Sequence, residues 1–166
     1  MGAIHLPRSV TFDKAIRFER GRTDLTFVPV GFGTPTDEAY TTRRVDNMLH
    51  CELHFRVGVL TATSAAIDLP SGFTINDSES DPQGLTDRSP LGEWTASTGS
   101  ASLTDIYNGT GQSGYVFYDG SDTDTVFMAH RTSNQSYEKR DANVFVGTNA
   151  AVSLIFKFPV LEWSNA

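Results

Sequence analysis

Apolar and polar side chains alternate residue by residue along segment 48–57. Successive side chains of a β-strand point to opposite faces, so this alternation predicts a strand with one buried and one wet face. The same pattern returns along segment 152–160, near the end of the sequence. The apolar positions of the two segments predict two halves of one core: Leu49, Cys51, Leu53, Phe55 and Val57, and then Val152, Leu154, Phe156, Phe158 and Val160.

Shorter apolar stretches predict further strands, because glycine, serine, threonine and asparagine separate them at short intervals. These candidates are 24–30, 40–45, 62–69, 91–97, 100–107, 114–118, 125–130 and, before the last strand, 141–146. Asp46-Asn47 predicts a tight turn before segment 48–57, and Asp119-Gly120 predicts a type I′ turn closing a hairpin of 114–118 and 125–130. The polar segment 76–90 predicts a long exposed connection.

The fold class follows from this series of short strands. No stretch of ten or more residues keeps a helical period with caps, and no repeat of fixed length occurs. About eight strands with loops of uneven length predict an all-β fold, an antiparallel β-sandwich of jelly-roll type. We expect residues 1–24 to form an extended N-terminal arm and residues 25–166 to form the sandwich domain.

Size and charge narrow the class of protein. The chain has 166 residues, which suits one domain. Its net charge of −7 argues against nucleic acid as a partner, because such binding relies on cations against phosphates. No apolar run approaches the roughly 20 residues that span a bilayer, so no membrane is expected as a partner. Residues 1–8 lack the apolar core of a secretory signal.

The charge is unevenly distributed. Residues 1–44 carry seven bases and five acids, whereas residues 68–124 carry ten acids and one base. One interpretation is an acidic, solvated surface that keeps the protein soluble. The other is a basic arm that seeks an acidic neighbour while the acidic body faces solvent.

His50, Glu52 and His54 are the first candidates for chemistry, because all three project from one face of the same predicted strand. A metal site of the cupin kind needs a third histidine and a further carboxylate on other strands, and only His5 and His130 remain. A polar strand face or a wet subunit contact is the simpler interpretation. Cys51 falls on the apolar face, where a buried and inert thiol is expected. We therefore predict no catalytic residue, metal site or cofactor, and no enzyme activity.

Aromatic residues offer a second candidate. A platform that stacks sugars is one interpretation of these side chains, and burial in a core or a subunit contact is the other and simpler one. They are Trp94, Trp163, Tyr107, Tyr115 and Tyr118.

Four short motifs occur in order along the chain. They are Tyr-Thr-Thr-Arg-Arg-Val-Asp-Asn at 40–47, Phe-Arg-Val-Gly at 55–58, Asp-Leu-Pro-Ser-Gly-Phe-Thr-Ile at 68–75, and Val-Ser-Leu-Ile-Phe-Lys-Phe-Pro-Val-Leu-Glu-Trp-Ser at 152–164. Over residues 25–164 the chain thereby resembles the small β module of tailed-bacteriophage virion proteins, often found at the C-terminus of tail-fibre and other structural polypeptides. It departs from that pattern at 45–47, which lacks a glycine, and at Glu162, which replaces one.

The resemblance implies a jelly roll that forms a homotrimer and works by adhesion, since a threefold ring multiplies a weak contact through avidity. The outward face of the last strand, with Ile155, suits the subunit contact, and His50 and His54 are its other candidates.

About 24 residues precede the module and no coiled-coil heptad forms a stalk, which favours a capsid decoration (cement) protein of the virion, assembled in the host cytoplasm. Its partner would be the major capsid protein or another virion protein. The residues of the arm expected to bind the capsid are Phe12, Ile16, Arg17, Phe18, Arg20 and Arg22. The alternative is a tail-associated receptor-binding or adaptor protein that contacts host surface glycans through loops 76–90 and 121–124, with Trp94 and the tyrosines stacking on sugars.

Overall fold

The computed structural model describes residues 25–77, 90–97, 112–118, 120, 122–131 and 137–163, and the regular secondary structure of these residues is mostly β-strand. Its strands are β1 (Val28–Val30), β2 (Thr36–Val45), β3 (Met48–Arg56), β4 (Ala66–Asp68), β5 (Gly92–Ala96), β6 (Gln112–Phe117), β7 (Thr125–Arg131), β8 (Tyr137–Lys139) and β9 (Ala151–Pro159). Two short helical turns accompany them, α3 (Ala142–Phe145) and the 3-10 turn η1 (Leu161–Trp163). No helix among these residues is long and apolar enough to cross a membrane. The predicted all-β class is confirmed.

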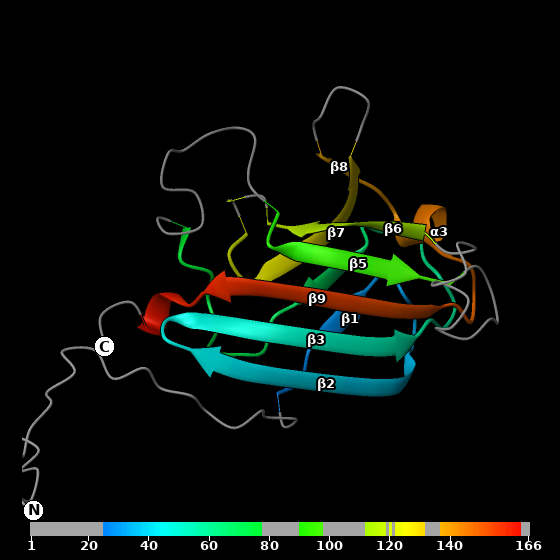
Figure 1. Cartoon of the computed structure of the whole chain (residues 1–166). Coiled ribbons are helices and arrows are strands. Elements are labelled where there is room, and N and C mark those ends of the chain that lie inside the picture. The colour runs from blue at the N-terminus through cyan, green and yellow to red at the C-terminus, as the bar shows by residue number, and fades with distance from the viewer. Residues whose placement is uncertain are drawn as a thin grey trace, which may run out of the picture.

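The strands form one antiparallel sheet in the order β1-β4-β7-β6-β5-β9-β3-β2. β8 pairs with one end of β7, beyond the stretch of β7 that pairs with β4. The last strand, β9, therefore lies in the middle of the sheet, between β3 and β5 (Figure 1).

The sheet curls into a half-barrel. β2, β3, β9 and β5 lie side by side in Figure 1. β1 is at the opposite end of the strand order from β2, and yet it lies behind these four strands. The ring of Phe27, just before β1, meets the ring of Tyr40 on β2 at 5.7 Å and that of Phe156 on β9 at 6.5 Å between centroids. These edge-to-face contacts hold the first segment across the inside of the curl.

The buried side of β3 and β9 matches the sequence pattern. The apolar side chains predicted to form the core are buried in both strands, and the polar side chains between them are more exposed. Across the β3–β9 pair, Leu49 lies opposite Phe158, Cys51 opposite Phe156 and Leu53 opposite Leu154. Such directly opposed pairs are the main units of sheet stabilisation.

The predicted turn at Asp46-Asn47 is confirmed, because Val45 pairs with Met48 and Asp46 takes a positive φ of 54°. The predicted hairpin of β6 and β7 is also present. Its last pair is Phe117 with Phe127, and β7 itself begins at Thr125. The predicted type I′ turn includes Asp119, which lies outside the described residues.

The β6–β7 connection has a structural role. Backbone N–H groups of Leu69 and Ile75 donate to the carbonyls of Asp124 at 2.8 Å and Thr123 at 2.9 Å. Tyr118 is fully buried, and its hydroxyl donates to Asp77 at 2.5 Å. The connection between β6 and β7 therefore packs against segment 69–77.

Segment 141–146 departs from the strand prediction. It forms the single turn α3, in which the Val146 N–H donates to the Ala142 carbonyl at 3.2 Å. Ala142 is fully buried against Gly31, where an added Cβ would lie 2.9 Å from the Cβ of Ala142. Burial of the small Ala142 side chain against Gly31 holds this turn in place. A turn of four residues is too short to show a helical period in the sequence.

Several predictions fall outside the described residues: the arm 1–24, the strand 100–107 and most of the connection 76–90. The described strands belong to one curled sheet. The jelly-roll sandwich with an extended arm accordingly stays a prediction.

Candidate binding face

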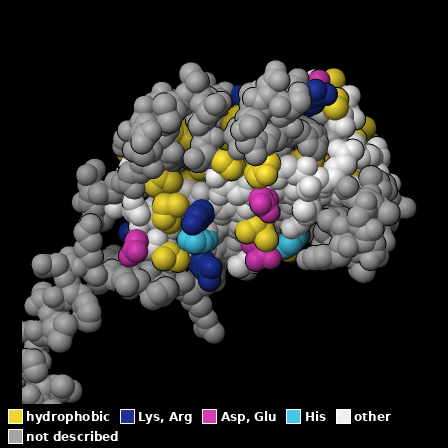
Figure 2. All heavy atoms as spheres, turned by 45° about the horizontal axis from the view of Figure 1, so that its top comes forward, with side chains coloured by type: hydrophobic (Ala, Val, Ile, Leu, Met, Phe, Trp, Pro, Cys, Tyr) yellow, Lys and Arg dark blue, Asp and Glu magenta, His cyan; other side chains and the backbone are white. Residues whose placement is uncertain are grey.

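The outward side chains of β2, β3, β9 and β5 form the outer face of the sheet. Strand register arranges them in rows that run across the strands, because residues directly opposite one another on antiparallel strands point to the same side. Figure 2 shows cationic, histidine, acidic and hydrophobic side chains alternating over this face. It is the part of the described structure where unlike chemical groups gather outside the core.

The first row, here called the basic row, consists of Arg43, His50 and Lys157. Arg43 on β2 lies opposite His50 on β3, and His50 lies opposite Lys157 on β9. The pKa of His50 is lowered from its usual 6.5, first by desolvation and then by the positive charges of Arg43 and Lys157. At neutral pH the row therefore carries two fixed charges around a neutral imidazole.

The second row, here called the central row, runs from Thr41 through Glu52 and Ile155 to Glu93. The Ile155 side chain is 62% exposed although it lies in the middle of the sheet. It contrasts with its buried neighbours Leu154 and Phe156.

His54 lies one row further along β3 and is held by Glu52. Its Nε2 lies 3.1 Å from Glu52 Oε1, a distance that suits a hydrogen bond. The other ring nitrogen, Nδ1, is buried and has no hydrogen-bond partner within the described part of the chain. Glu52 is thereby directed toward His54 and not toward the basic row.

A hollow of about 490 Å³ opens on this face. Residues of β2, β3 and β9, with the residue just before β5, line it: Thr41, Thr42, Arg43, His50, Cys51, Glu52, Leu91, Ile155, Phe156 and Lys157. Its volume falls in the range of small-molecule sites, roughly 300–1,000 Å³. The sequence pattern indicated the polar face of β3 but gave no sign of the hollow, since its walls come from segments far apart in the chain.

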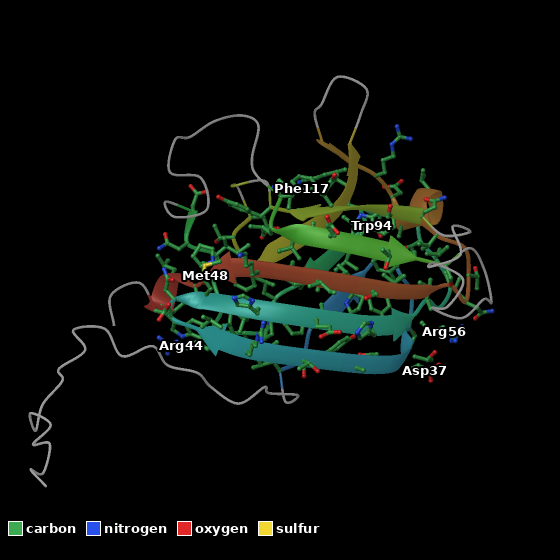
Figure 3. All side chains as sticks on the ribbon, in the orientation of Figure 1. Asp37, Arg44, Met48, Arg56, Trp94 and Phe117 are labelled. Atoms are coloured by element: carbon green, nitrogen blue, oxygen red, sulfur yellow. The ribbon has the colours of Figure 1, made fainter. Side chains whose placement is uncertain are left out.

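The two ends of the β2–β3 hairpin hold their arginines differently (Figure 3). At one end, the Arg56 Nε donates to Asp37 Oδ2 at 3.2 Å and its Nη1 donates to the Asn149 carbonyl at 3.0 Å. At the other, the Arg44 Nε donates to the Asp46 carbonyl at 2.8 Å, and its guanidinium carbon lies 4.3 Å from the Trp163 ring centroid. Both arginines are therefore tied to structural partners.

The metal interpretation of His50, Glu52 and His54 gains no support from the geometry. Among the described residues, no three histidine, cysteine, aspartate or glutamate side chains converge as a metal would require. The neighbours of His50 across the strands are cations, which repel a divalent metal. Cys51 is buried as predicted, and desolvation raises the pKa of its thiol far above the usual range.

The aromatic residues divide between the core and the end of the sheet. Trp94 is 1% exposed and donates its indole N–H to the Ala129 carbonyl at 3.2 Å, and Tyr118 is fully buried. The hypothesis that these two stack on sugars is therefore wrong, because neither ring is accessible. Trp163 packs edge-to-face with Phe73 at 5.7 Å between ring centroids. Tyr107 lies outside the described residues.

The remaining candidate residues divide as follows. His50, His54 and Ile155 come together on the outer face, where the sequence placed them. The arm residues Phe12, Ile16, Arg17, Phe18, Arg20 and Arg22 lie outside the described part of the chain. Sequence reasoning missed Arg43 and Lys157, which only the pairing of β2, β3 and β9 brings beside His50.

Comparison with known proteins adds no relative. No protein-family model matches the chain, and neither the curated proteins nor the solved structures give a match.

Proposed function

We propose that this chain is a structural protein of a tailed-bacteriophage virion, and specifically a homotrimeric capsid decoration protein. The observation that carries the proposal is the ordered set of four motifs at 40–47, 55–58, 68–75 and 152–164. The antiparallel β-fold is compatible with the jelly-roll module that those motifs imply.

The subunit contact in this proposal lies on the outer face. Ile155 is its apolar centre, and His50 and His54 flank it on the neighbouring strand. Four strands present this face without a covering layer of described residues (Figure 2). In a threefold ring each subunit contacts both neighbours through two different patches, and the outer face would supply one of them.

The capsid contact in this proposal lies in the arm, residues 1–24. Its apolar members Phe12, Ile16 and Phe18 alternate with basic residues, a composition that suits an extended segment adding to the edge of a neighbouring sheet. The acidic part of the chain would then face solvent and keep decorated particles from associating.

Deletion of residues 1–22 tests this role. We expect the truncated chain to remain folded and trimeric and to lose co-sedimentation with the capsid shells of the phage that encodes it. A triple variant, R17Q with R20Q and R22Q, separates charge from length and should weaken binding more at low salt than at high salt. Full retention of shell binding by the truncated chain would exclude the arm as the capsid contact.

A further inference from the structure

Three cationic or protonatable groups lie side by side in the basic row. Directly opposite residues on antiparallel strands have Cβ atoms about 4.5–5.5 Å apart, so Arg43 and Lys157 flank His50 closely. The two fixed charges lie on either side of the imidazole, and each opposes its protonation. The row is conspicuous in a chain whose net charge is −7.

No carboxylate offsets the row within the described part of the chain. Glu52 is the acidic residue that lines the same hollow, and it pairs with His54 at 3.1 Å. The arginines at the ends of the hairpin, Arg44 and Arg56, each have partners of their own. Arg43 differs from them, because no ion pair or side-chain hydrogen bond joins it to a described residue.

We propose that the basic row is a binding site for the phosphate or sulfate group of a small anionic molecule. The guanidinium of Arg43 provides a fork of donors that matches an oxyanion, and Lys157 provides a mobile point charge from the opposite side. His50 between them provides a ring N–H. An anion there is attracted to both fixed charges and favours protonation of the imidazole between them.

The rest of the hollow indicates what is attached to the anion. At about 490 Å³ it is larger than an inorganic oxyanion needs. Ile155 and Leu91 line it beside the row and give an apolar surface for an organic moiety. The shared chemistry is therefore a tetrahedral oxyanion, either free or as a monoester of a small organic molecule.

Binding at this site depends on pH through His50. The groups that face its ring are Arg43 from β2 and Lys157 from β9, and Glu52 on its own strand is turned to His54. A bound anion favours the imidazolium, so it raises the pKa of His50, which the two cations hold low. By linkage, affinity for the anion increases as the pH falls through this pKa. The increase is about tenfold for every pH unit by which the bound anion raises the pKa.

The test is an NMR titration of the histidine rings in the full-length chain, with His50 assigned by H50Q. It compares inorganic phosphate, sulfate and glycerol phosphate with chloride at equal ionic strength. We expect an oxyanion to raise the pKa of His50 by about one pH unit. R43Q and K157Q should remove this rise, whereas the matched control R56Q, on the same strand as His50, should retain it.

The comparison of inorganic phosphate with glycerol phosphate shows whether the site takes a free oxyanion or an organic monoester. Tighter binding of glycerol phosphate than of inorganic phosphate supports an organic monoester, and equal binding supports a free oxyanion. An identical His50 pKa in chloride and in all three oxyanions would overturn the proposal, as would an equal rise in R43Q and the unaltered chain. The anion site and the proposed subunit contact share His50 and Ile155, so the two proposals concern one face of the sheet. They fail separately, because the His50 pKa reports anion binding and the solution mass reports self-association.

Discussion

Replacement of Trp94 by alanine is expected to lower the free energy of unfolding by about 3–5 kcal/mol, the usual cost of truncating a large buried aromatic side chain. Trp94 is 1% exposed and lies opposite Leu154 in the β5–β9 pair. Its indole edge fits against Gly114, where an added Cβ would lie 2.7 Å from the ring nitrogen. Urea unfolding followed by far-UV circular dichroism measures the loss.

Two further variants make this result interpretable. Trp94→Phe keeps most of the ring but leaves the Ala129 carbonyl without its indole donor, so its loss should be smaller than that of Trp94→Ala. Ile155→Ala, next to Leu154 but on the outer face, should change stability by less than about 0.5 kcal/mol when measured on dissociated protein. Equal losses for Trp94→Ala and Ile155→Ala would contradict the assignment of inner and outer faces.

Replacement of Gly92 by valine is expected to disrupt the pairing of β5 with β9. An added Cβ at this position would lie 2.1 Å from the Ile155 carbonyl oxygen and 2.5 Å from the Phe156 Cα. Both are backbone atoms of the central strand β9, so neither can give way as a flexible side chain would. We expect a loss at or above the top of the usual range for overpacking, about 1–3 kcal/mol. Thermal unfolding with a parallel measure of soluble yield detects it.

Thr95→Val is the matched control for Gly92→Val. Thr95 lies on the same strand and points to the outer face opposite Ser153. Its replacement by valine exchanges a hydroxyl for a methyl group of similar size, so it introduces the same residue type as Gly92→Val without adding bulk. Valine also suits a strand. We expect its unfolding temperature to stay close to that of the unaltered chain. If Gly92→Val melts like Thr95→Val, the close approach of β5 to β9 is wrong.

The sequence predicted those parts of the fold that depend on local pattern. Strict alternation identified β3 and β9 with their buried and exposed sides, because burial on one face of a strand repeats every second residue. Asp46 was recognisable as a turn residue, since aspartate tolerates a positive φ. Burial of Cys51 followed from the same alternation.

The parts that sequence reasoning missed depend on contacts between distant segments. The place of β9 between β3 and β5 is a matter of pairing, and alternation alone does not choose the partner. The basic row exists only because that pairing puts Lys157 beside His50 and because β2 adds Arg43. Trp94 was compatible with either a sugar platform or a core until the register placed it inside. Gly92 gave no local sign that β9 approaches it so closely.

The central claim, self-association through the outer face as a virion trimer, is tested most directly by the solution mass of the full-length chain. Multi-angle light scattering after size exclusion should give about three times 18.1 kDa across a range of concentrations. The variant Ile155→Asp should fall toward the mass of one chain, because it places a carboxylate at the apolar centre of the contact. A mass of one chain at every concentration, equal for the unaltered protein and Ile155→Asp, would contradict the account.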